Sequence, residues 1–331
     1  MYIKDIGGEF ALIGRLAHMV PVDHDQVVVG IGDDAAVLKS GNDPDQYILV
    51  TTDTLVADDH FKLSWARPDQ IGIKAAECNI SDIAAMGGTP VCLFVSLVLT
   101  PRTTVQWVEQ LYSGLAESCR NHHAVIAGGD TTHGSVITIG ITVLGTVPRE
   151  HLCLRSHARA GDLLAVTGML GASGAGLRLL TEQKPVSPYL MEKHLTPRCR
   201  MDAARHLAPI VHAMIDISDG LASEVNHICN RSNVGACVYA DQIPLHPDVI
   251  EAGKTLGVNP VEFALNGGED FELLFTVSPD NVDRLDRTGV KYHVVGKIRP
   301  ASEGRFLVDP SQKPVVLKGG YNHFNDTRPQ S

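Results

Sequence analysis

The sequence has no CxxC pair, no long apolar run and no cluster of basic residues, and each absence excludes a class of protein. Its seven cysteines are scattered along the chain, which argues against a zinc motif or a disulfide framework and indicates reduced thiols in the cytosol. The strongest apolar run, residues 91–99, is too short to cross a bilayer, and charged residues at Asp5, Glu9 and Arg15 interrupt any secretory signal core. We therefore expect a cytoplasmic protein with no membrane partner.

The chain has 28 basic residues (Lys and Arg) and 38 acidic ones (Asp and Glu), and no basic cluster is interleaved with aromatic residues. Both features argue against nucleic acid as a partner. At 331 residues the chain exceeds what a single hydrophobic core usually supports, so we expect two domains. A turn-rich stretch at Pro148, Arg149 and Glu150 interrupts the pattern of strands and helices. It predicts a boundary between an N-terminal domain over residues 1–148 and a C-terminal domain over residues 149–331.

Short acidic turns follow several apolar runs. Residues 48–50 read as a buried strand. Thr51, Thr52 and Asp53 then present two hydroxyls and a carboxylate at its rigid end. Four further turns of this kind lie at residues 32–34, 79–82, 128–130 and 216–220. Aspartate and glycine are ordinary turn residues, which is the alternative interpretation of any single site, but five sites together favour a hard cation such as Mg²⁺.

One predicted helix and one predicted strand bear on these turns. The helix is expected after Pro68, with Asp69 as its N-cap. Asn79 and Asp82 lie three residues apart on it and therefore face the same way. Residues 135–147 alternate between apolar and small polar side chains, which predicts a long strand that needs a partner surface.

Two glycine-rich turns are further candidates. The turn at residues 168–176 matches neither GxGxxG nor a P-loop, so a packing role is favoured over phosphate binding there. The turn NGGED at residues 266–270 is expected to aim Glu269 or Asp270 into a cleft, because its two glycines allow a sharp reversal of the chain.

Seven motifs, spread over nearly the whole chain, carry a resemblance to a known family. They are GIGDDAAVL at 30–38, TTDTLVADDHF at 51–61, NISDIAAMGGTP at 79–90, AGGDTTHG at 127–134, VTGMLGASGAGL at 166–177, DISDGL at 216–221 and NGGEDFELLF at 266–275. In this order they resemble the thiamine-monophosphate kinases. The resemblance implies a two-domain aminoimidazole ribonucleotide synthetase-like fold, with an N-terminal α/β domain and a C-terminal α+β domain. It also implies a homodimer in which the N-terminal strands of two subunits form a barrel, which would bury the exposed side of the strand at 135–147.

Positions that match the family's motifs give an expected set of site residues. The implied metal ligands are Asp33, Thr51, Thr52, Asp53, Asp82, Asp130, Asp216 and Asp219. The implied ATP contacts are Gly129, Asp130, Arg155, Ser218 and Tyr112. The implied contacts to thiamine monophosphate are His60, Glu269 and Tyr321. Of these, Tyr321 is suited to stack on a flat cationic ring.

The activity implied by the resemblance is ATP-dependent phosphorylation of thiamine monophosphate to thiamine diphosphate, the last step in making that cofactor. Several Mg²⁺ ions would neutralise the phosphates and align them for direct in-line transfer. The acceptor is already an anionic phosphate oxygen, so no strong base is required and His60 is interpreted as a binding residue. We therefore expect no catalytic group beyond the metal ligands.

Two other classes of function are weighed against this one. The first is another ATP-dependent enzyme of the same fold, of the selenophosphate synthetase or aminoimidazole ribonucleotide synthetase type. Against a selenophosphate synthetase, no reactive cysteine or glycine-rich segment precedes Gly30. A structural module that binds calcium or a nucleotide is the second, and no EF-hand spacing supports it.

Overall fold

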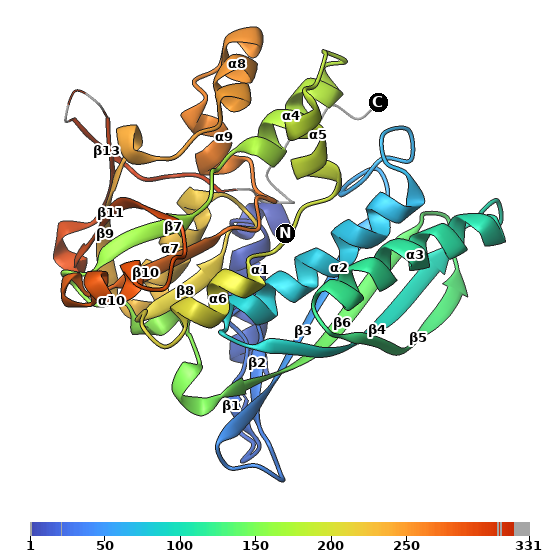
Figure 1. Ribbon diagram of the computed structural model, residues 1–331, viewed down its shortest axis with the longest axis horizontal. Helices are drawn as coiled ribbons and strands as arrows, with labels where there is room; N and C mark the ends of the chain where they lie inside the picture. The colour runs from blue at the N-terminus through green and yellow to red at the C-terminus, as the bar shows by residue number, and fades with distance from the viewer. Residues whose placement is uncertain (1, 21, 310, 312, 321–331) are drawn as a thin grey trace.

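The first half of the chain forms a mixed β-sheet (Figure 1). The computed structural model describes residues 2–20, 22–309, 311 and 313–320. Over these residues the sheet has six strands in the order β1-β2-β3-β6-β4-β5, with β4 and β5 parallel and the other neighbours antiparallel. The strands are β1 (Val27–Val29), β2 (Ala36–Lys39), β3 (Gln46–Val56), β4 (Thr89–Leu99), β5 (Val125–His133) and β6 (Thr138–Pro148).

Two long helices cover one face of this sheet. α2 (Pro68–Ala85) and α3 (Val105–Asn121) lie side by side along the strands (Figure 1). They approach closely because two glycines face the neighbouring backbone, and a Cβ on Gly72 would lie only 2.1 Å from the carbonyl oxygen of Leu111. The helix predicted after Pro68 is confirmed, but the prediction of Asp69 as its N-cap is wrong. Arg67 is the N-cap, and Asp69 lies in the first turn, where its carboxylate pairs with the Arg67 guanidinium at 2.8 Å.

The other face of the sheet is open in the single chain. β6 alternates as predicted, with Ile139 and Ile141 fully buried on the helix side and Thr142 on the open side. On β4, Phe94 and Val91 expose 38% and 48% of their surface. The edge strand β5 is exposed over nearly its whole length. An apolar, solvent-exposed sheet face of this kind is typical of an interaction surface.

The second half forms another mixed sheet, which over the described residues has the order β13-β12-β9-β11-β7-β10-β8. Its strands are β7 (Leu163–Thr167), β8 (Ala213–Asp216), β9 (Val234–Tyr239), β10 (Leu273–Val277), β11 (Tyr292–Pro300), β12 (Arg305–Val308) and β13 (Pro314–Val316). The other helices of the chain are α1 (Glu9–Met19), α4 (Ala172–Thr181), α5 (Pro188–Leu195), α6 (Met201–Leu207), α7 (Leu221–Ser232), α8 (Pro247–Leu256), α9 (Val261–Asn266) and α10 (Val282–Asp286). Short 3-10 helices are η1 (Ile3–Ile6), η2 (Arg149–His151), η3 (Arg155–His157), η4 (Ala240–Gln242), η5 (Pro279–Asn281) and η6 (Ala301–Glu303).

The two halves share a hydrophobic core. The cluster that lies between the first sheet and α2 also contains Leu207 of α6 and Phe275 of β10, both fully buried. α2 therefore packs against both halves, and the ends of strands from both sheets reach it. Among the helices that the structure describes, none is long and apolar enough to cross a membrane.

Candidate active site

A cluster of acidic side chains lies where β3, α2 and β8 meet. The hydroxyl of Thr51 on β3 donates to Asp82 Oδ2 on α2 at 2.6 Å. One turn earlier on α2, the side-chain oxygen of Asn79 accepts from the backbone N–H of Asp53 at 2.9 Å. These two contacts fix the middle of β3 against the helix, on the face that the spacing of Asn79 and Asp82 predicted. The strand end expected at Asp53 is wrong, because β3 continues to Val56.

The second half adds a carboxylate to the same place. Asp216 stands at the end of β8, fully enclosed, and its Oδ2 accepts a hydrogen bond from Ser81 Oγ on α2 at 2.6 Å. Asp34, Asp82 and Asp216 each bring one oxygen to within 4.8 Å of the others. The structure thus brings together carboxylates from three elements that are far apart in the sequence.

Burial and mutual repulsion raise the pKa values of the carboxyl groups in this cluster. Burial, followed by the charge of Asp53, raises the pKa of Asp82 well above its usual value. Burial and the charge of Asp34 have the same effect on the pKa of Asp216, and they raise that of Asp33 to about 7. Like charges this close are stable only when protons or cations compensate them. The donors are carboxylate and hydroxyl oxygens, which is the ligand set that suits Mg²⁺.

Arg155, a predicted ATP contact, holds the loop between β1 and β2 in place. Its guanidinium Nη2 donates to Asp34 Oδ1 at 2.6 Å, and its backbone N–H lies 3.3 Å from both carboxylate oxygens of Asp33. The side chain of Arg155 is mostly buried, so it partly compensates the two acids. In this structure it therefore orders the acidic cluster from the side of η3.

Two acids of the cluster were not predicted. Asp34 is adjacent to Asp33 in the motif GIGDDAAVL, and the motif alone does not tell which carboxylate turns inward. Glu224 lies on α7, where its Oε1 accepts from the backbone N–H of Asp219 at 2.9 Å. Burial and the charge of Asp219 raise the pKa of Glu224 well above its usual value. Glu224 therefore extends the acidic cluster beside a predicted ligand.

Thr52 and Asp130 lie on the open face of the sheet. Thr51 faces α2, so its neighbour Thr52 faces the opposite side, where its hydroxyl accepts from Thr142 at 3.2 Å. Asp130 pairs with Ser96 across the β4–β5 ladder, on that same open side. Three strand spacings separate β5 from β3, about 14 Å. Within one chain these two residues, and Gly129 beside Asp130, therefore do not join the acidic cluster, and their binding roles stay predictions.

A second polar cluster surrounds Glu269. The Nζ of Lys74, a fully enclosed side chain on α2, lies 2.7 Å from Glu269 Oε1 and donates to the carbonyl oxygen of His60 at 3.0 Å. The other carboxylate oxygen faces Nδ1 of the buried His194 at 3.5 Å. The backbone N–H of Glu269 donates to the carbonyl oxygen of Ser218 at 2.7 Å. The predicted residues His60, Ser218 and Glu269 are thus brought together.

Lys74 and His194 were missed at the sequence level. Lys74 carried a signal, since it lies three residues after Ile71 on the predicted core face of its helix, where a charge needs a partner. Burial alone would raise the pKa of Glu269, but the charge of Lys74, the neighbouring histidines and the hydrogen bond with Lys74 together outweigh burial, and the pKa is lowered. Burial, assisted by Lys74, lowers the pKa of His194 to about 4. At neutral pH the site therefore holds a charged carboxylate, a charged amine and a neutral imidazole.

The glycine-rich turn before α4 is occupied by a side chain of the protein. Asp270 Oδ2 accepts from the backbone N–H of Gly171 at 2.6 Å, and Oδ1 accepts from that of Ser173 at 3.4 Å. The backbone amides at this helix N-terminus therefore already have the carboxyl group of Asp270 as their acceptor. A Cβ on Gly174 would lie 2.6 Å from the Cα of Gly267, so the two glycine-rich turns pack directly on each other.

Two tyrosines of the predicted site stand apart. Tyr112 lies on α3 and packs, partly buried, against the first core. Tyr321 lies outside the described residues.

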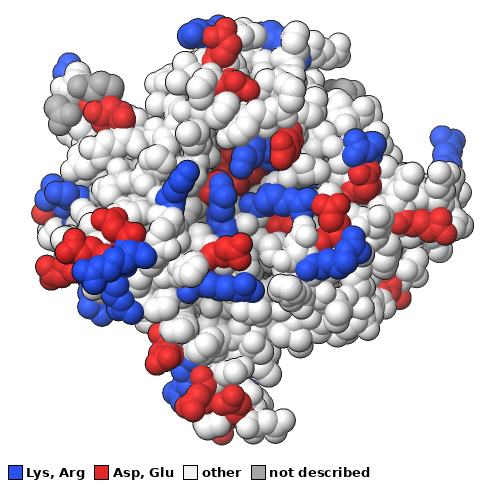
Figure 2. All heavy atoms as spheres, viewed as in Figure 1, with Lys and Arg blue, Asp and Glu red and all other residues white. Residues whose placement is uncertain are grey.

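Charged side chains of both signs are interspersed on the face of the molecule shown in Figure 2, and several lie over the region where α2, α5 and α6 meet (Figures 1 and 2).

Comparison with known proteins supports one family. The AIR synthase related protein family matches with its N-terminal domain at residues 32–147 and with its C-terminal domain at residues 159–309. The thiamine-monophosphate kinase of Bacillus subtilis is 36% identical over 329 residues, which cover 96% of this chain and 99% of that protein. The chain belongs to the thiamine-monophosphate kinase family.

Solved structures of thiamine-monophosphate kinases have the same fold. The structure described as "AaThiL complexed with AMPPCP and TMP" aligns with a TM-score of 0.86 at 33% identity, over 98% of this chain and 99% of that one. Hydrogenase maturation protein HypE in complex with ATP aligns with a TM-score of 0.70 but at 18% identity, over 94% of this chain and 95% of that one. That second similarity concerns the fold alone. The two matched domains confirm the predicted two-domain aminoimidazole ribonucleotide synthetase-like architecture, in which the structure shows a mixed sheet in each half.

Proposed function

We propose that this protein transfers the γ-phosphoryl group of ATP directly to the phosphate of thiamine monophosphate, giving thiamine diphosphate and ADP. The observation that carries the proposal is that α2 connects the two polar clusters. Asp82 and Lys74 stand eight residues apart on this helix, about 12 Å along its axis. The helix therefore presents an oxygen-rich cluster for phosphates at one point and the Lys74–Glu269 pair for the rest of the acceptor at another.

The acidic cluster is proposed to hold Mg²⁺. Mg²⁺, when bound there, would neutralise the phosphates and align them for in-line transfer. The proposed ligands in this cluster are Asp33, Thr51, Asp53, Asp82, Asp216 and Asp219, with Asp34 added from the structure. Thr52 and Asp130, which lie on the open face of the sheet, are proposed to bind Mg²⁺ there. Thr51 and Ser81 keep the carboxylates in fixed orientations through their hydroxyls. The acceptor oxygen is an anion, so the residues of this site need only bind and orient it.

The remaining predicted contacts complete the proposal. Arg155, Ser218, Tyr112 and Gly129 are assigned to ATP, and His60, Glu269 and Tyr321 to thiamine monophosphate. Lys74 compensates most of the charge of Glu269, so Glu269 serves as an oriented hydrogen-bond acceptor more than as a counter-charge. We also propose that the two domains divide at Pro148. A cytoplasmic location belongs to the same proposal, and it fits the seven free cysteines.

The substrate is tested by product formation and by one variant. Purified protein with ATP and Mg²⁺ is expected to convert thiamine monophosphate to thiamine diphosphate. Glu269→Gln removes the paired charge and replaces one of the two acceptor oxygens by an amide donor, so KM for thiamine monophosphate should rise roughly tenfold, the effect of one lost hydrogen bond to a charged group, while KM for ATP changes little. Glu251→Gln, an exposed acid on α8, is the matched control. If no thiamine diphosphate forms but selenide is phosphorylated, the chain is a sister enzyme of this fold.

The stability of the metal-free protein should depend on pH because of Asp33. Its pKa is raised to about 7 by burial, so the folded protein keeps a proton that the unfolded chain releases above about pH 4. Stability from this group is therefore lost as pH rises from about 4 to 7, by up to about 1.4 kcal/mol per pH unit. Mg²⁺ should consequently raise Tm more at pH 8 than at pH 5.5, as differential scanning fluorimetry can measure. Equal Tm gains at the two pH values would contradict the metal assignment, and Asp33→Asn should reduce the difference.

We also propose a homodimer that buries the open face of the first sheet. Phe94, Val91 and Val125 expose apolar surface on β4 and the edge strand β5, and the predicted ligands Thr52 and Asp130 lie in the same region. Phe94→Glu should therefore convert a dimer into a monomer in analytical ultracentrifugation, because it places a charge in an apolar interface. Val105→Glu, on the 75%-exposed first residue of α3, is the matched control and should remain dimeric. A wild-type protein that sediments as a folded monomer at micromolar concentration would refute the proposal.

A further inference from the structure

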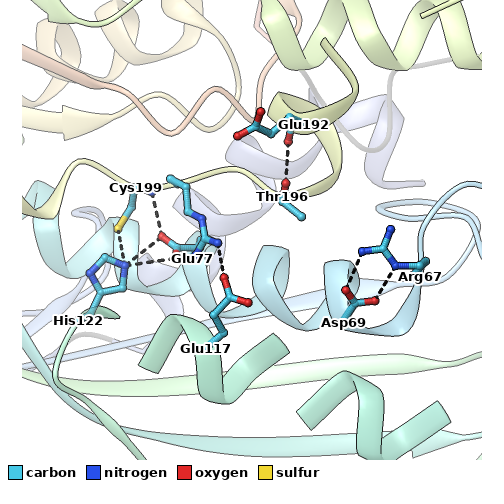
Figure 3. A network of polar contacts seen from close by, with 9 residues as sticks. Arg67, Asp69, Glu77, Glu117, His122, Glu192, Thr196 and Cys199 are labelled. Carbon is cyan, nitrogen blue, oxygen red and sulfur yellow. Dashed lines mark hydrogen bonds and ion pairs between the residues drawn. The ribbon is translucent and has the colours of Figure 1, made fainter. Parts of the chain in front are cut away.

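A third cluster of titratable side chains lies outside the site described above. Glu77 of α2, His122 at the end of α3 and Cys199, between α5 and α6, meet in the interior (Figure 3). The carboxylate of Glu77 is fully enclosed, Cys199 is nearly so, and the His122 side chain exposes 12% of its surface. The reaction proposed for the acidic cluster uses none of these three residues.

The distances between the three groups are those of ligands around one ion. His122 Nε2 lies 3.1 Å from Glu77 Oε2 and 3.7 Å from Cys199 Sγ, and one atom of each residue lies within 4.8 Å of the others. Tetrahedral zinc with bonds of about 2.0–2.3 Å separates neighbouring ligand atoms by about 3.3–3.6 Å. The two distances from His122 Nε2 therefore need to change by only a few tenths of an ångström for an ion to enter between these atoms.

The chemistry of the donors selects the metal. A carboxylate oxygen, an imidazole nitrogen and a sulfur suit Zn²⁺ or Co²⁺, whereas Mg²⁺ takes oxygen ligands. Binding would release the thiol proton of Cys199 to solvent, so the two anions Glu77 and Cys199 would balance the 2+ charge of the ion. A neutral complex of this kind is the form that a buried position favours.

One cation already lies beside the cluster. Arg198 Nη1 contacts Glu77 Oε1 at 3.1 Å, and its Nη2 contacts Glu117 Oε1 at 2.5 Å. The Arg198 side chain is 42% exposed, so it lies between the cluster and solvent. Its bond to Glu117 keeps it in place when Glu77 is shared with an ion, and a water arriving from this side can be the fourth ligand.

We propose that Glu77, His122 and Cys199 form a binding site for a divalent transition metal of the Zn²⁺ type, with water as the fourth ligand. The ion would join α2 and α3 of the first half to the segment that leads into α6 of the second half. Its position is separate from the acidic cluster, because Glu77 precedes Asp82 by five residues and points to a different side of α2. The site thus has a stabilising function and no contact with the reacting phosphates.

Cobalt spectroscopy tests the site on the full chain. Protein stripped with a chelator and then saturated with Mg²⁺, which occupies oxygen sites, is titrated with Co²⁺. One Co²⁺ per chain should give a thiolate charge-transfer band in the near ultraviolet together with the visible bands of a tetrahedral ion. Stoichiometric Zn²⁺ should bleach these bands and raise Tm.

Variants decide which cysteine and histidine are responsible. Cys199→Ser should abolish the near-ultraviolet band, and His122→Asn should weaken Co²⁺ binding by roughly tenfold or more. Cys229→Ser, which changes another fully buried thiol, should keep the wild-type spectrum. Circular dichroism and phosphoryl-transfer activity establish that each variant is folded, and His122→Asn still gives the answer if Cys199→Ser does not fold. No thiolate band at stoichiometric Co²⁺, or a band that persists in Cys199→Ser, overturns the proposal.

Discussion

Asp82→Asn is expected to lower kcat by about 10²- to 10³-fold and, at the same time, to raise the Tm of the metal-free protein at pH 8. The loss of rate follows from removing a ligand charge where the phosphates must be neutralised, a term that supplies much of the transition-state stabilisation. The gain in Tm follows from crowding, because burial and Asp53 raise the pKa of Asp82 and its charged form is unfavourable in the fold. Steady-state kinetics and differential scanning fluorimetry measure the two effects.

The opposite signs of these effects separate a metal ligand from a structural residue. A residue needed only for folding would lower activity and Tm together. Asp69→Asn is the matched control on the same helix, since Asp69 is partly exposed and pairs with the exposed Arg67, and it should change neither quantity by much. Asp53→Asn should behave like Asp82→Asn. Wild-type kcat in Asp82→Asn at saturating Mg²⁺ would remove this carboxylate from the reaction.

The motifs predicted the place at which polar groups come together more accurately than they predicted which residues take part. Thr51 and Asp82 were predicted together, and the structure joins them by a hydrogen bond. The strand period already separates Thr51 from Thr52, because adjacent residues of one strand point to opposite faces. A list of ligands taken from a motif does not carry that information, whereas the alternation does. The sequence therefore contained the distinction that the structure makes between the two threonines.

Contacts between the halves could not be derived from spacing. Ser81 and Asp216 are separated by 135 positions, and their hydrogen bond depends on how the second sheet packs against α2. Glu224 was missed for the same reason, since nothing in its own helix marks it as part of an acidic cluster. β12 and β13 were missed because both strands are too short to show a clear alternation.

The second large effect is expected on stability, when Lys74 of the central helix α2 is replaced. Removing one partner of a buried ion pair usually costs about 3–5 kcal/mol, because the other charge remains uncompensated. Glu269 keeps 25% of its side chain exposed, so Lys74→Met should destabilise the protein by about 2–3 kcal/mol, near or below the lower end of that range. The Lys74 hydrogen bond to His60 is lost as well, so KM for thiamine monophosphate should rise.

Denaturant titrations of Lys74→Met at two pH values test this origin of the loss. In the wild type the lowered pKa of Glu269 contributes stability above about pH 4.5, and this contribution disappears as pH falls through the pKa of the folded protein. Without Lys74, burial raises that pKa, so the stability deficit should be larger at pH 7.5 than at pH 5. Adding Glu269→Gln to Lys74→Met should recover part of the lost stability, since no unpaired charge is then left. Lys193→Met is the control, because Lys193 lies 4.0 Å from Glu272 while Arg200 already pairs with that carboxylate. A deficit that is the same at both pH values, and that the second substitution does not reduce, would mean that lost packing rather than an unpaired charge destabilises the variant.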